Sequence, residues 1–156
     1  MPQPNEPRSP APLEAHLGFW LRFVSNHVSS RFQQLLEAQG VTVTEWVALR
    51  TLADQEHTTH ASLIRALGMT KGAASKVMSR LEEKGLAVRQ ARDGRAREQS
   101  LALTPQGHAL VPRLAALADA NDAHFFGHLS TTEREALSQS MQALVQHHAL
   151  KVVPTE

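Results

Sequence analysis

The sequence predicts a mainly α-helical protein with a small β-hairpin. Apolar residues recur every three or four positions along most of the chain, which is the spacing of helices that bury one face. Around residues 86–103 the spacing changes to about two, as it does in strands. Between these two strand-like runs lies Arg92-Asp93-Gly94-Arg95, and Asp-Gly is a strong signal for a tight hairpin because glycine accepts a positive φ.

A long helix is expected first, from Leu13 to Gly40. Its apolar stripe consists of Leu13, Leu17, Trp20, Val24, Val28, Phe32 and Leu35. Thr42 and Glu45 then have the spacing of a capping box, in which each side chain accepts a hydrogen bond from the other's backbone N–H. They predict the start of a second helix, which runs through Leu52. The polar run 54–60 that follows is expected to be a loop.

Two shorter helices are expected next, separated by a tight turn. The third helix carries Leu63, Ile64 and Leu67, and Gly68 ends it. Thr70 caps the fourth helix, which ends at Gly85. The predicted buried face of that helix consists of Ala74, Val77, Met78 and Leu81.

The hairpin leads into the last two helices. Its strands are expected to place apolar side chains at Leu86, Val88, Leu101 and Leu103. Thr104-Pro105 predicts the start of a fifth helix, with Leu110, Leu114, Leu117 and Ala118 on one side. Pro112 interrupts that pattern, so either the helix is kinked there, which we favour, or its regular part starts later. Ser130 and Glu133 form a second capping box, which opens a sixth helix through Leu137, Met141, Leu144 and Val145.

This order of elements predicts a winged helix-turn-helix preceded by an extra helix, and its charge predicts binding to DNA. Residues 65–97 contain nine Lys or Arg and three acidic residues, a net charge of +6, so the rest of the chain carries −5 in a total of +1. Such a concentrated cationic segment is typical of proteins that dock on phosphates. A module that only binds proteins would have little use for the arginines at the hairpin tip.

The outward face of the fourth helix is predicted to enter the major groove. It presents small residues between cations and hydroxyls, namely Gly72, Ser75, Lys76, Ser79 and Arg80. Thr70 and Lys71, at the helix start, suit a backbone phosphate. Arg95 at the hairpin tip is expected in the minor groove, with Arg92 and Arg97 on flanking phosphates.

Composition limits the other functional classes. The chain has no cysteine, which excludes disulfides and thiol redox sensing, and no apolar run long enough for a membrane span. Five prolines among the first twelve residues predict a disordered arm rather than a signal peptide, so the cytoplasm is the expected location. The sequence also lacks a glycine-rich phosphate loop, an HExxH motif and a nucleophile elbow, so we expect no enzymatic activity and no cofactor.

Three segments of the chain resemble the MarR family of transcriptional regulators. They are Val41-Thr42-x-x-Glu45-Trp46-x-x-Leu49, Thr70-Lys71-Gly72-Ala73-Ala74-Ser75-x-x-x-x-x-Leu81-Glu82-x-x-Gly85-Leu86, and Asp93-x-Arg95-x-x-x-x-x-Leu101-x-Leu103-Thr104-x-x-Gly107. The third is the most specific, because it links the hairpin tip, the second strand and the following helix at fixed spacing. The resemblance covers about residues 13–150.

The resemblance implies a homodimeric repressor that binds a pseudo-palindromic site in double-stranded DNA and is released by a small ligand. It also implies recognition roles for Ser75, Lys76, Ser79 and Arg80 and a wing role for Arg95. A dimer is expected independently, because the apolar stripes at both ends exceed what a small winged module can cover. The expected division is a Pro-rich arm (1–12), a dimerisation helix (13–40), the winged helix-turn-helix (41–104), two dimerisation helices (105–150) and a tail (151–156).

The effector is open to several interpretations. A phenolic ligand would lie where the first, second and fifth helices meet, near Trp20, Phe23, His27 and Trp46, although we favour the interpretation of these as ordinary core and interface residues. His124 and His128 are four residues apart on a predicted helix, which is a possible metal-binding spacing. The helix is expected to fray at His128, so no metal site is assigned.

Overall fold

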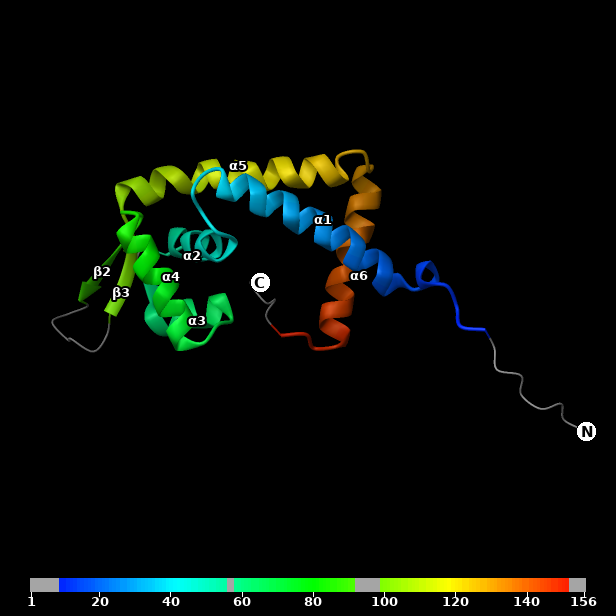
Figure 1. The fold of residues 1–156 in the computed structure, drawn as a ribbon, viewed down its shortest axis with the longest axis horizontal. Helices are drawn as coiled ribbons and strands as arrows, with labels where there is room; N and C mark the ends of the chain where they lie inside the picture. The colour runs from blue at the N-terminus through cyan, green and yellow to red at the C-terminus, as the bar shows by residue number, and fades with distance from the viewer. Residues whose placement is uncertain (1–8, 56–57, 92–98, 152–156) are drawn as a thin grey trace, which may run out of the picture.

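The computed structural model describes residues 9–55, 58–91 and 99–151, and within them the chain is mostly helical (Figure 1). A 3₁₀ turn, η1, precedes six α-helices and three short strands. Their bounds are η1 Leu13–Ala15, α1 Leu17–Glu37, α2 Val43–Ala53, β1 Thr58–Thr59, α3 His60–Leu67, α4 Lys71–Glu83, β2 Ala87–Ala91, β3 Gln99–Leu103, α5 Pro105–Phe126 and α6 Thr131–His147. The predicted fold class is confirmed.

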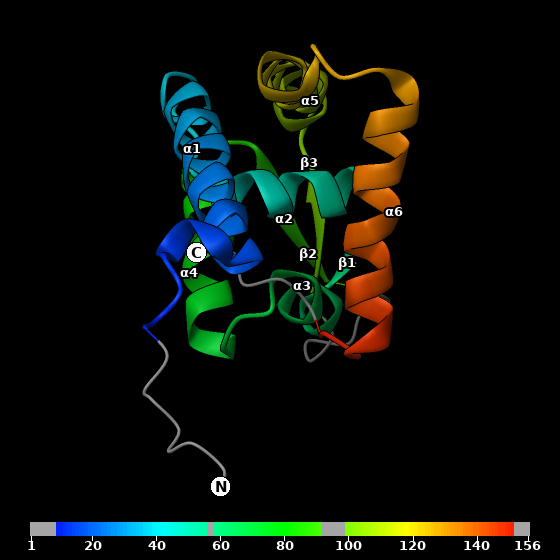
Figure 2. The same cartoon turned by 90° about the vertical axis from the view of Figure 1, so that its right-hand side faces the viewer.

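The molecule has a winged module at one end and helix α6 at the other. Helices α1 and α5 lie side by side and connect the two ends (Figures 1 and 2). Helices α2, α3 and α4 pack around an antiparallel sheet with the strand order β1-β3-β2. No helix within the described residues is both long and apolar enough to cross a membrane.

Hydroxyl side chains begin most of the helices. The predicted caps Thr42, Thr70, Thr104 and Ser130 each accept a hydrogen bond from the backbone N–H three residues later. Both predicted capping boxes are complete, since Glu45 and Glu133 accept the return bonds from the N–H groups of Thr42 and Ser130. Thr59, which the sequence analysis placed in a loop, caps α3 in the same way.

The core of the winged module fixes which face of α4 points outward. The four residues predicted to be buried on this helix are all buried: Ala74, Val77, Met78 and Leu81. They pack with apolar residues of α2, α3 and the sheet in one cluster. Gly68 and Gly85, at the two ends of this region, have φ of 62° and 69°, a backbone conformation that favours glycine. The chain therefore turns sharply before and after α4.

Two polar connections hold α4 against its neighbours. The ammonium of Lys84, which follows α4, donates to Glu45 Oε2 and to the carbonyl of Gly40, both at 2.7 Å. On the other side, the hydroxyl of Thr104 donates to the carbonyl of Gly85 at 2.6 Å. The turn after α4 is thus tied both to the start of α2 and to the start of α5.

Helix α5 also approaches this turn closely. A Cβ on Gly107 would lie 2.1 Å from the carbonyl oxygen of Leu86, so only glycine fits there without a shift of the backbone. The backbone N–H of Thr104 donates to the same oxygen at 3.1 Å. These contacts set the position of α5 relative to the winged module.

Two sequence predictions about helices and loops are wrong in detail. The first helix does not run unbroken from Leu13, because His16 is extended (φ −98°, ψ 128°) and interrupts the hydrogen-bond ladder. Leu13 and Leu17 are 68% and 88% exposed, so no packing holds a continuous helix there. The run 54–60 is not all loop, since Thr58 and Thr59 pair with β3 and His60 begins α3.

The strand pattern of the hairpin also differs from expectation, whereas α5 starts where Thr104-Pro105 predicted. In β2 the buried residue is Ala87, whereas Val88 is 41% exposed. The side chains that face the core are therefore the alternate set from the one predicted. Leu101 and Leu103 are buried as predicted. Helix α5 begins at Pro105 and runs through Pro112, so its regular part does not start later.

Candidate nucleic-acid interface

The face of α4 opposite the core carries the residues predicted to read DNA. Gly72, Lys76 and Arg80 are exposed, and Ser75 and Ser79 are half-buried at the edge of the core. An open depression along the helix is lined by Ser75, Lys76, Ser79, Arg80 and Glu83. The structure therefore brings four of the predicted residues together, with one acidic neighbour.

The start of α4 presents backbone donors and a cation. Thr70 Oγ1 accepts from the backbone N–H of Ala73 at 3.2 Å, so its hydroxyl is already used as the cap. Lys71, the first residue of the helix, is exposed. The positive end of the helix dipole and the Lys71 ammonium act in the same direction, which favours an anion at this end.

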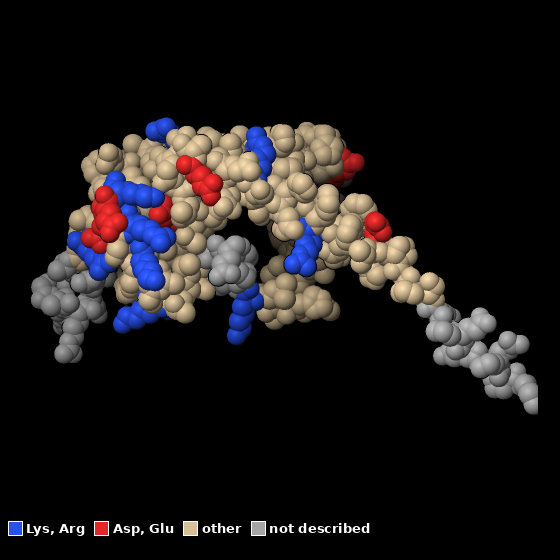
Figure 3. Space-filling model, viewed as in Figure 1, with Lys and Arg blue, Asp and Glu red and all other residues tan. Residues whose placement is uncertain are grey.

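Basic side chains gather at this end of the molecule. Figure 3 shows Lys and Arg side chains concentrated over α4 and the adjoining elements, with few elsewhere on the same face. The acidic side chains among them include Glu82, which is paired with Arg89 at 2.5 Å between Oε1 and Nε. The pairing neutralises a negative charge that would otherwise repel phosphate.

Sequence reasoning missed two residues that contact the predicted reading face. Arg89 on β2 donates from Nη2 to Ser79 Oγ at 3.2 Å, and Nε2 of His60 lies 3.4 Å from Ser75 Oγ. Both contacts depend on how α3 and β2 pack against α4, which the sequence pattern did not indicate.

His60 lies in a cationic environment. Burial lowers its pKa, and the charges of Lys71 on α4 and Arg89 on β2 lower it further. The proton is therefore held less tightly in the folded protein than in the unfolded chain, where the pKa is about 6.5. Protonation of His60 consequently opposes folding.

A pH titration of stability should reveal this effect. The free energy of unfolding is expected to be independent of His60 above about pH 7 and to fall as the pH drops below about 6.5, because the unfolded chain then binds more protons. In His60→Gln the fall should be smaller, as measured by urea unfolding at several pH values. Parallel pH profiles for the two proteins would show that His60 is not destabilised by its neighbours.

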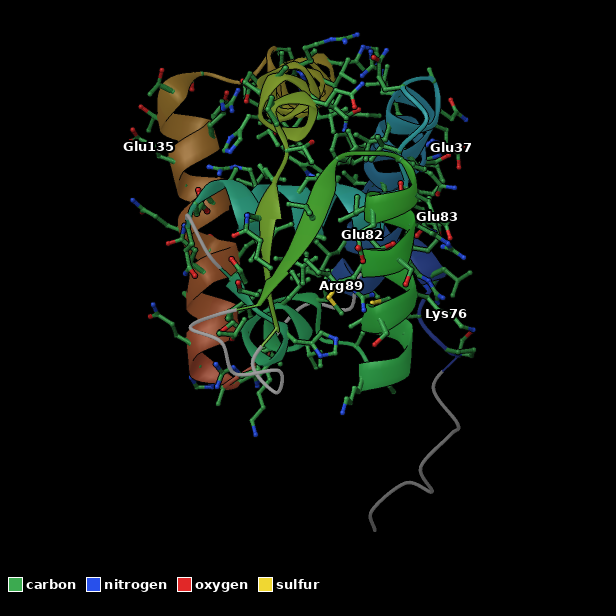
Figure 4. All side chains as sticks on the ribbon, turned by 90° about the vertical axis from the view of Figure 1, so that its left-hand side faces the viewer. Glu37, Lys76, Glu82, Glu83, Arg89 and Glu135 are labelled. Atoms are coloured by element: carbon green, nitrogen blue, oxygen red, sulfur yellow. The ribbon has the colours of Figure 1, made fainter. Side chains whose placement is uncertain are left out.

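The hairpin strands are present where the sequence predicted them. Strands β2 and β3 pair in register from Ala87 opposite Leu103 to Ala91 opposite Gln99. The connecting segment, with Arg92, Arg95 and Arg97, lies outside the described residues. Figure 4 shows the strand β2 beside α4.

The structure separates the residues suggested for an effector. Trp20, Phe23 and His27 follow one another along α1, with ring centroids 6.5 Å and 4.9 Å apart, and all three are exposed. Trp46 lies instead against Phe32, at 6.4 Å, where α1 meets α2. The four residues therefore form two aromatic groups rather than one.

The histidines suggested for a metal lie at the end of α5. His124 is in the last turn of the helix, and His128 follows the C-cap Gly127, as the expected fraying implied. Among the described residues there is no group of three or more His, Cys, Asp or Glu side chains placed to hold a metal ion.

Comparison with known proteins shows similarity to the MarR family. A model of the MarR family matches residues 39–98, which include α2, α3, α4 and β2. The HTH-type transcriptional repressor Rv2887 of Mycobacterium tuberculosis is 28% identical over 131 residues, which cover 84% of this chain and 94% of that protein. The resemblance to the MarR family that the sequence predicted is confirmed by these matches. The prediction that it is not an enzyme is confirmed, since this family and this relative are transcriptional regulators.

Solved structures share the fold of this chain. BpsR of Bordetella bronchiseptica, whose DNA binding is regulated by 6-hydroxynicotinic acid, aligns with a TM-score of 0.74 at 24% identity, over 87% of this chain and 97% of BpsR. Staphylococcus aureus MepR in complex with DNA also has a TM-score of 0.74, at 22% identity, over 85% of this chain and 98% of MepR. These similarities establish the winged helix fold.

Proposed function

We propose that this MarR-family regulator is a repressor that binds a pseudo-palindromic operator as a homodimer and is released by a small ligand. The observation that carries the proposal is the outward face of α4, where small residues alternate with Lys76 and Arg80 beside an arginine-rich hairpin. A helix with such a surface suits a major groove about 12 Å wide, because the small residues permit close approach. MepR provides a precedent, as a protein of this fold in complex with DNA.

The remaining contacts are assigned around that helix. Thr70, Lys71 and Gly72 at its start would lie against a backbone phosphate, and Ser75, Lys76, Ser79 and Arg80 would face base edges and the adjoining backbone. Arg95 would enter the neighbouring minor groove, where a cation is favoured by the negative potential, with Arg92 and Arg97 on phosphates. The net charge of +6 over residues 65–97 supports this arrangement.

Exposed apolar side chains support a dimer. On α6, Leu137, Met141, Leu144 and Val145 are 44% to 51% exposed, and on α1, Trp20, Leu21, Phe23 and Val24 are 43% to 58% exposed. Figure 2 shows these two helices on opposite sides of α5, at the end of the molecule away from the hairpin. Burial of both rows against a second copy would place two recognition helices about 34–36 Å apart, one turn of duplex.

A small aromatic acid is the proposed effector class. BpsR, which shares this fold, responds to 6-hydroxynicotinic acid. In this chain, aromatic side chains are available near Trp20, Phe23 and His27 on α1 and near Trp46 where α1 meets α2. A thermal-shift screen of phenolic and pyridine carboxylic acids tests this part, because a ligand that binds the folded state raises the melting temperature.

Salt dependence of DNA binding tests the proposed function as a whole. The probe is the duplex upstream of the protein's own gene, and binding is measured by fluorescence anisotropy. Neutralisation of six phosphates would give a slope of log K against log salt of about −5. A protein-interaction module would show weak binding and a flat plot, which would overturn the proposal.

Arg95→Ala is expected to weaken operator binding by more than about ten-fold, which corresponds to about 1.4 kcal/mol, while the protein remains dimeric. Gel shifts measure the affinity, and light scattering measures the mass. Arg113→Ala is the control, because Arg113 lies on α5 and donates to Gln39 at 2.9 Å, away from the hairpin. Equal affinities for the two variants would remove the wing role from Arg95.

A further inference from the structure

Three side chains join the recognition helix to the first hairpin strand. Arg89 reaches from β2 to α4, where Nε lies 2.5 Å from Glu82 Oε1 and Nη2 donates to Ser79 Oγ at 3.2 Å. Ser79 and Glu82 are three residues apart on α4, so they lie on the same face of the helix. Figure 4 shows the Arg89 side chain between β2 and α4, next to Glu82. The guanidinium is thus held by a carboxylate and turned toward a hydroxyl.

This arrangement fixes the direction of the hydrogen bond at Ser79. An arginine side chain has only donors, so Ser79 Oγ must be the acceptor in this contact. A serine hydroxyl has a single hydrogen, and among the described residues no carbonyl or side-chain oxygen receives it. Ser79 is half-buried on the outward side of α4, so its hydrogen remains available to a group outside the protein.

Ser75 provides an internal contrast. Its Oγ lies 3.4 Å from His60 Nε2, and an imidazole nitrogen either donates or accepts, depending on its tautomer and protonation. The hydroxyl of Ser75 can therefore point its hydrogen inward or outward. The bond from Arg89 uses one of the two lone pairs of Ser79 Oγ and leaves the hydrogen free. Of these two serines, only Ser79 has a described partner that can act solely as a donor.

We propose that Glu82 and Arg89 hold Ser79 as an outward hydrogen-bond donor, which makes one position of each half-site selective for a base that presents an acceptor. In the major groove those acceptors are N7 and O6 of guanine, N7 of adenine and O4 of thymine, whereas cytosine presents the N4 amino donor. Arg89 is a positioning residue in this scheme, and Ser79 is the residue that reads the base. The inference rests on the proposed function, since it requires α4 to lie in the major groove.

The presence of Glu82 supports a positioning role for Arg89. An arginine without an acidic partner can bind phosphate with its full positive charge. A carboxylate beside the arginine offsets that charge and so weakens phosphate binding. Arg89 and Glu82 are each about one-third exposed, 36% and 34%, so the pair sits at the surface without being fully solvated. A pair of net charge zero contributes little attraction for DNA, but it restrains the planar guanidinium in one orientation.

Arg89→Lys is the diagnostic variant, because it keeps the charge and removes the rigid fork. A lysine ammonium is a point charge, so it is not held toward Glu82 and Ser79 in one fixed geometry. The probe is a site selected by the full-length wild-type protein from a randomised duplex pool, with each base pair then varied singly. Wild type should favour an acceptor base over cytosine by about five-fold at one position per half-site, and Arg89→Lys should reduce this to about two-fold or less.

Matched variants separate positioning from other roles. Arg50→Lys makes the same change in another arginine–carboxylate pair, that of Arg50 on α2 with the C-cap Asp54, and should leave the preference unchanged. Ser79→Ala should abolish the preference, and adding Arg89→Lys to it should change nothing further. The salt slope should remain that of wild type in Arg89→Lys, because the charge is retained.

The outcomes distinguish this inference from the proposed function. Failure of the wild-type protein to enrich any duplex, with a flat salt plot, would reject the proposed function. Specific binding with an unchanged base preference in Arg89→Lys would reject the positioning role alone. A change of preference that persists in the Ser79→Ala background would show that Arg89 reads a base directly, which would also overturn the inference.

Discussion

Met141→Glu is expected to convert the dimer to a monomer and to weaken operator binding by about 100-fold or more. Met141 is 44% exposed in a row with Leu137, Leu144 and Val145 on α6, and burial of a carboxylate in such a contact costs several kcal/mol. A monomer would engage one half-site only, so it would lose the contribution of the second recognition helix. Light scattering reports the mass, and anisotropy with an operator duplex reports the affinity.

Gln139→Glu is the control for that experiment. It introduces the same charge two residues away, on the opposite face of α6, where the side chain is exposed. This variant should remain dimeric and bind the operator within about two-fold of wild type, since most surface substitutions have small effects. A dimeric Met141→Glu protein would mean that the apolar row on α6 does not form the interface.

Gly107→Ala is expected to lower the free energy of unfolding by about 3 kcal/mol. The added Cβ would lie 2.1 Å from the carbonyl oxygen of Leu86 and 3.2 Å from its carbonyl carbon. Both are backbone atoms, so the start of α5 must move away from the turn after α4. The higher helix propensity of alanine, about 1 kcal/mol, offsets only part of this cost. Urea unfolding measures the difference.

Gly18→Ala is the matched control for Gly107→Ala. Gly18 is also helical, but a Cβ there would meet nothing within 4 Å. The urea unfolding midpoint of Gly18→Ala should be equal to or above that of the wild-type protein. Equal midpoints for the two alanine variants would show that α5 does not depend on the close approach to Leu86.

Local chemistry explains why most helix boundaries were predictable. Each capping box requires two residues at fixed spacing, and the glycines at 68 and 85 adopt the positive φ expected of helix ends. The buried face of α4 followed from spacing alone, because four apolar residues cover one side of a short helix. These features depend on neighbours within one turn, so the sequence carries them directly.

Features that depend on distant partners were not predictable. Strand β1 is two residues long and exists because Thr58 and Thr59 pair with Leu101 and Ser100, far along the chain. In β2 the sequence predicted the wrong buried residue. Val88 is apolar and Ala87 is small, so the pattern favoured Val88, whereas packing against α4 buries Ala87. The roles of His60 and Arg89 depend on that packing, so the candidate site was predicted without its supporting side chains.

The attachment of α5 to the turn after α4 has a mechanical consequence. Helix α5 has 22 residues, so it is about 33 Å long, and the Thr104–Gly85 hydrogen bond anchors one end to the turn after α4. The other end carries α6 and the exposed apolar row. A rigid rod of this length that tilts by about 5° displaces its far end by about 3 Å, comparable with a hydrogen-bond length. A small change in how two copies pack would therefore tilt α5 and move the winged modules by a few ångströms. Such a shift would misalign them with the two half-sites of the duplex.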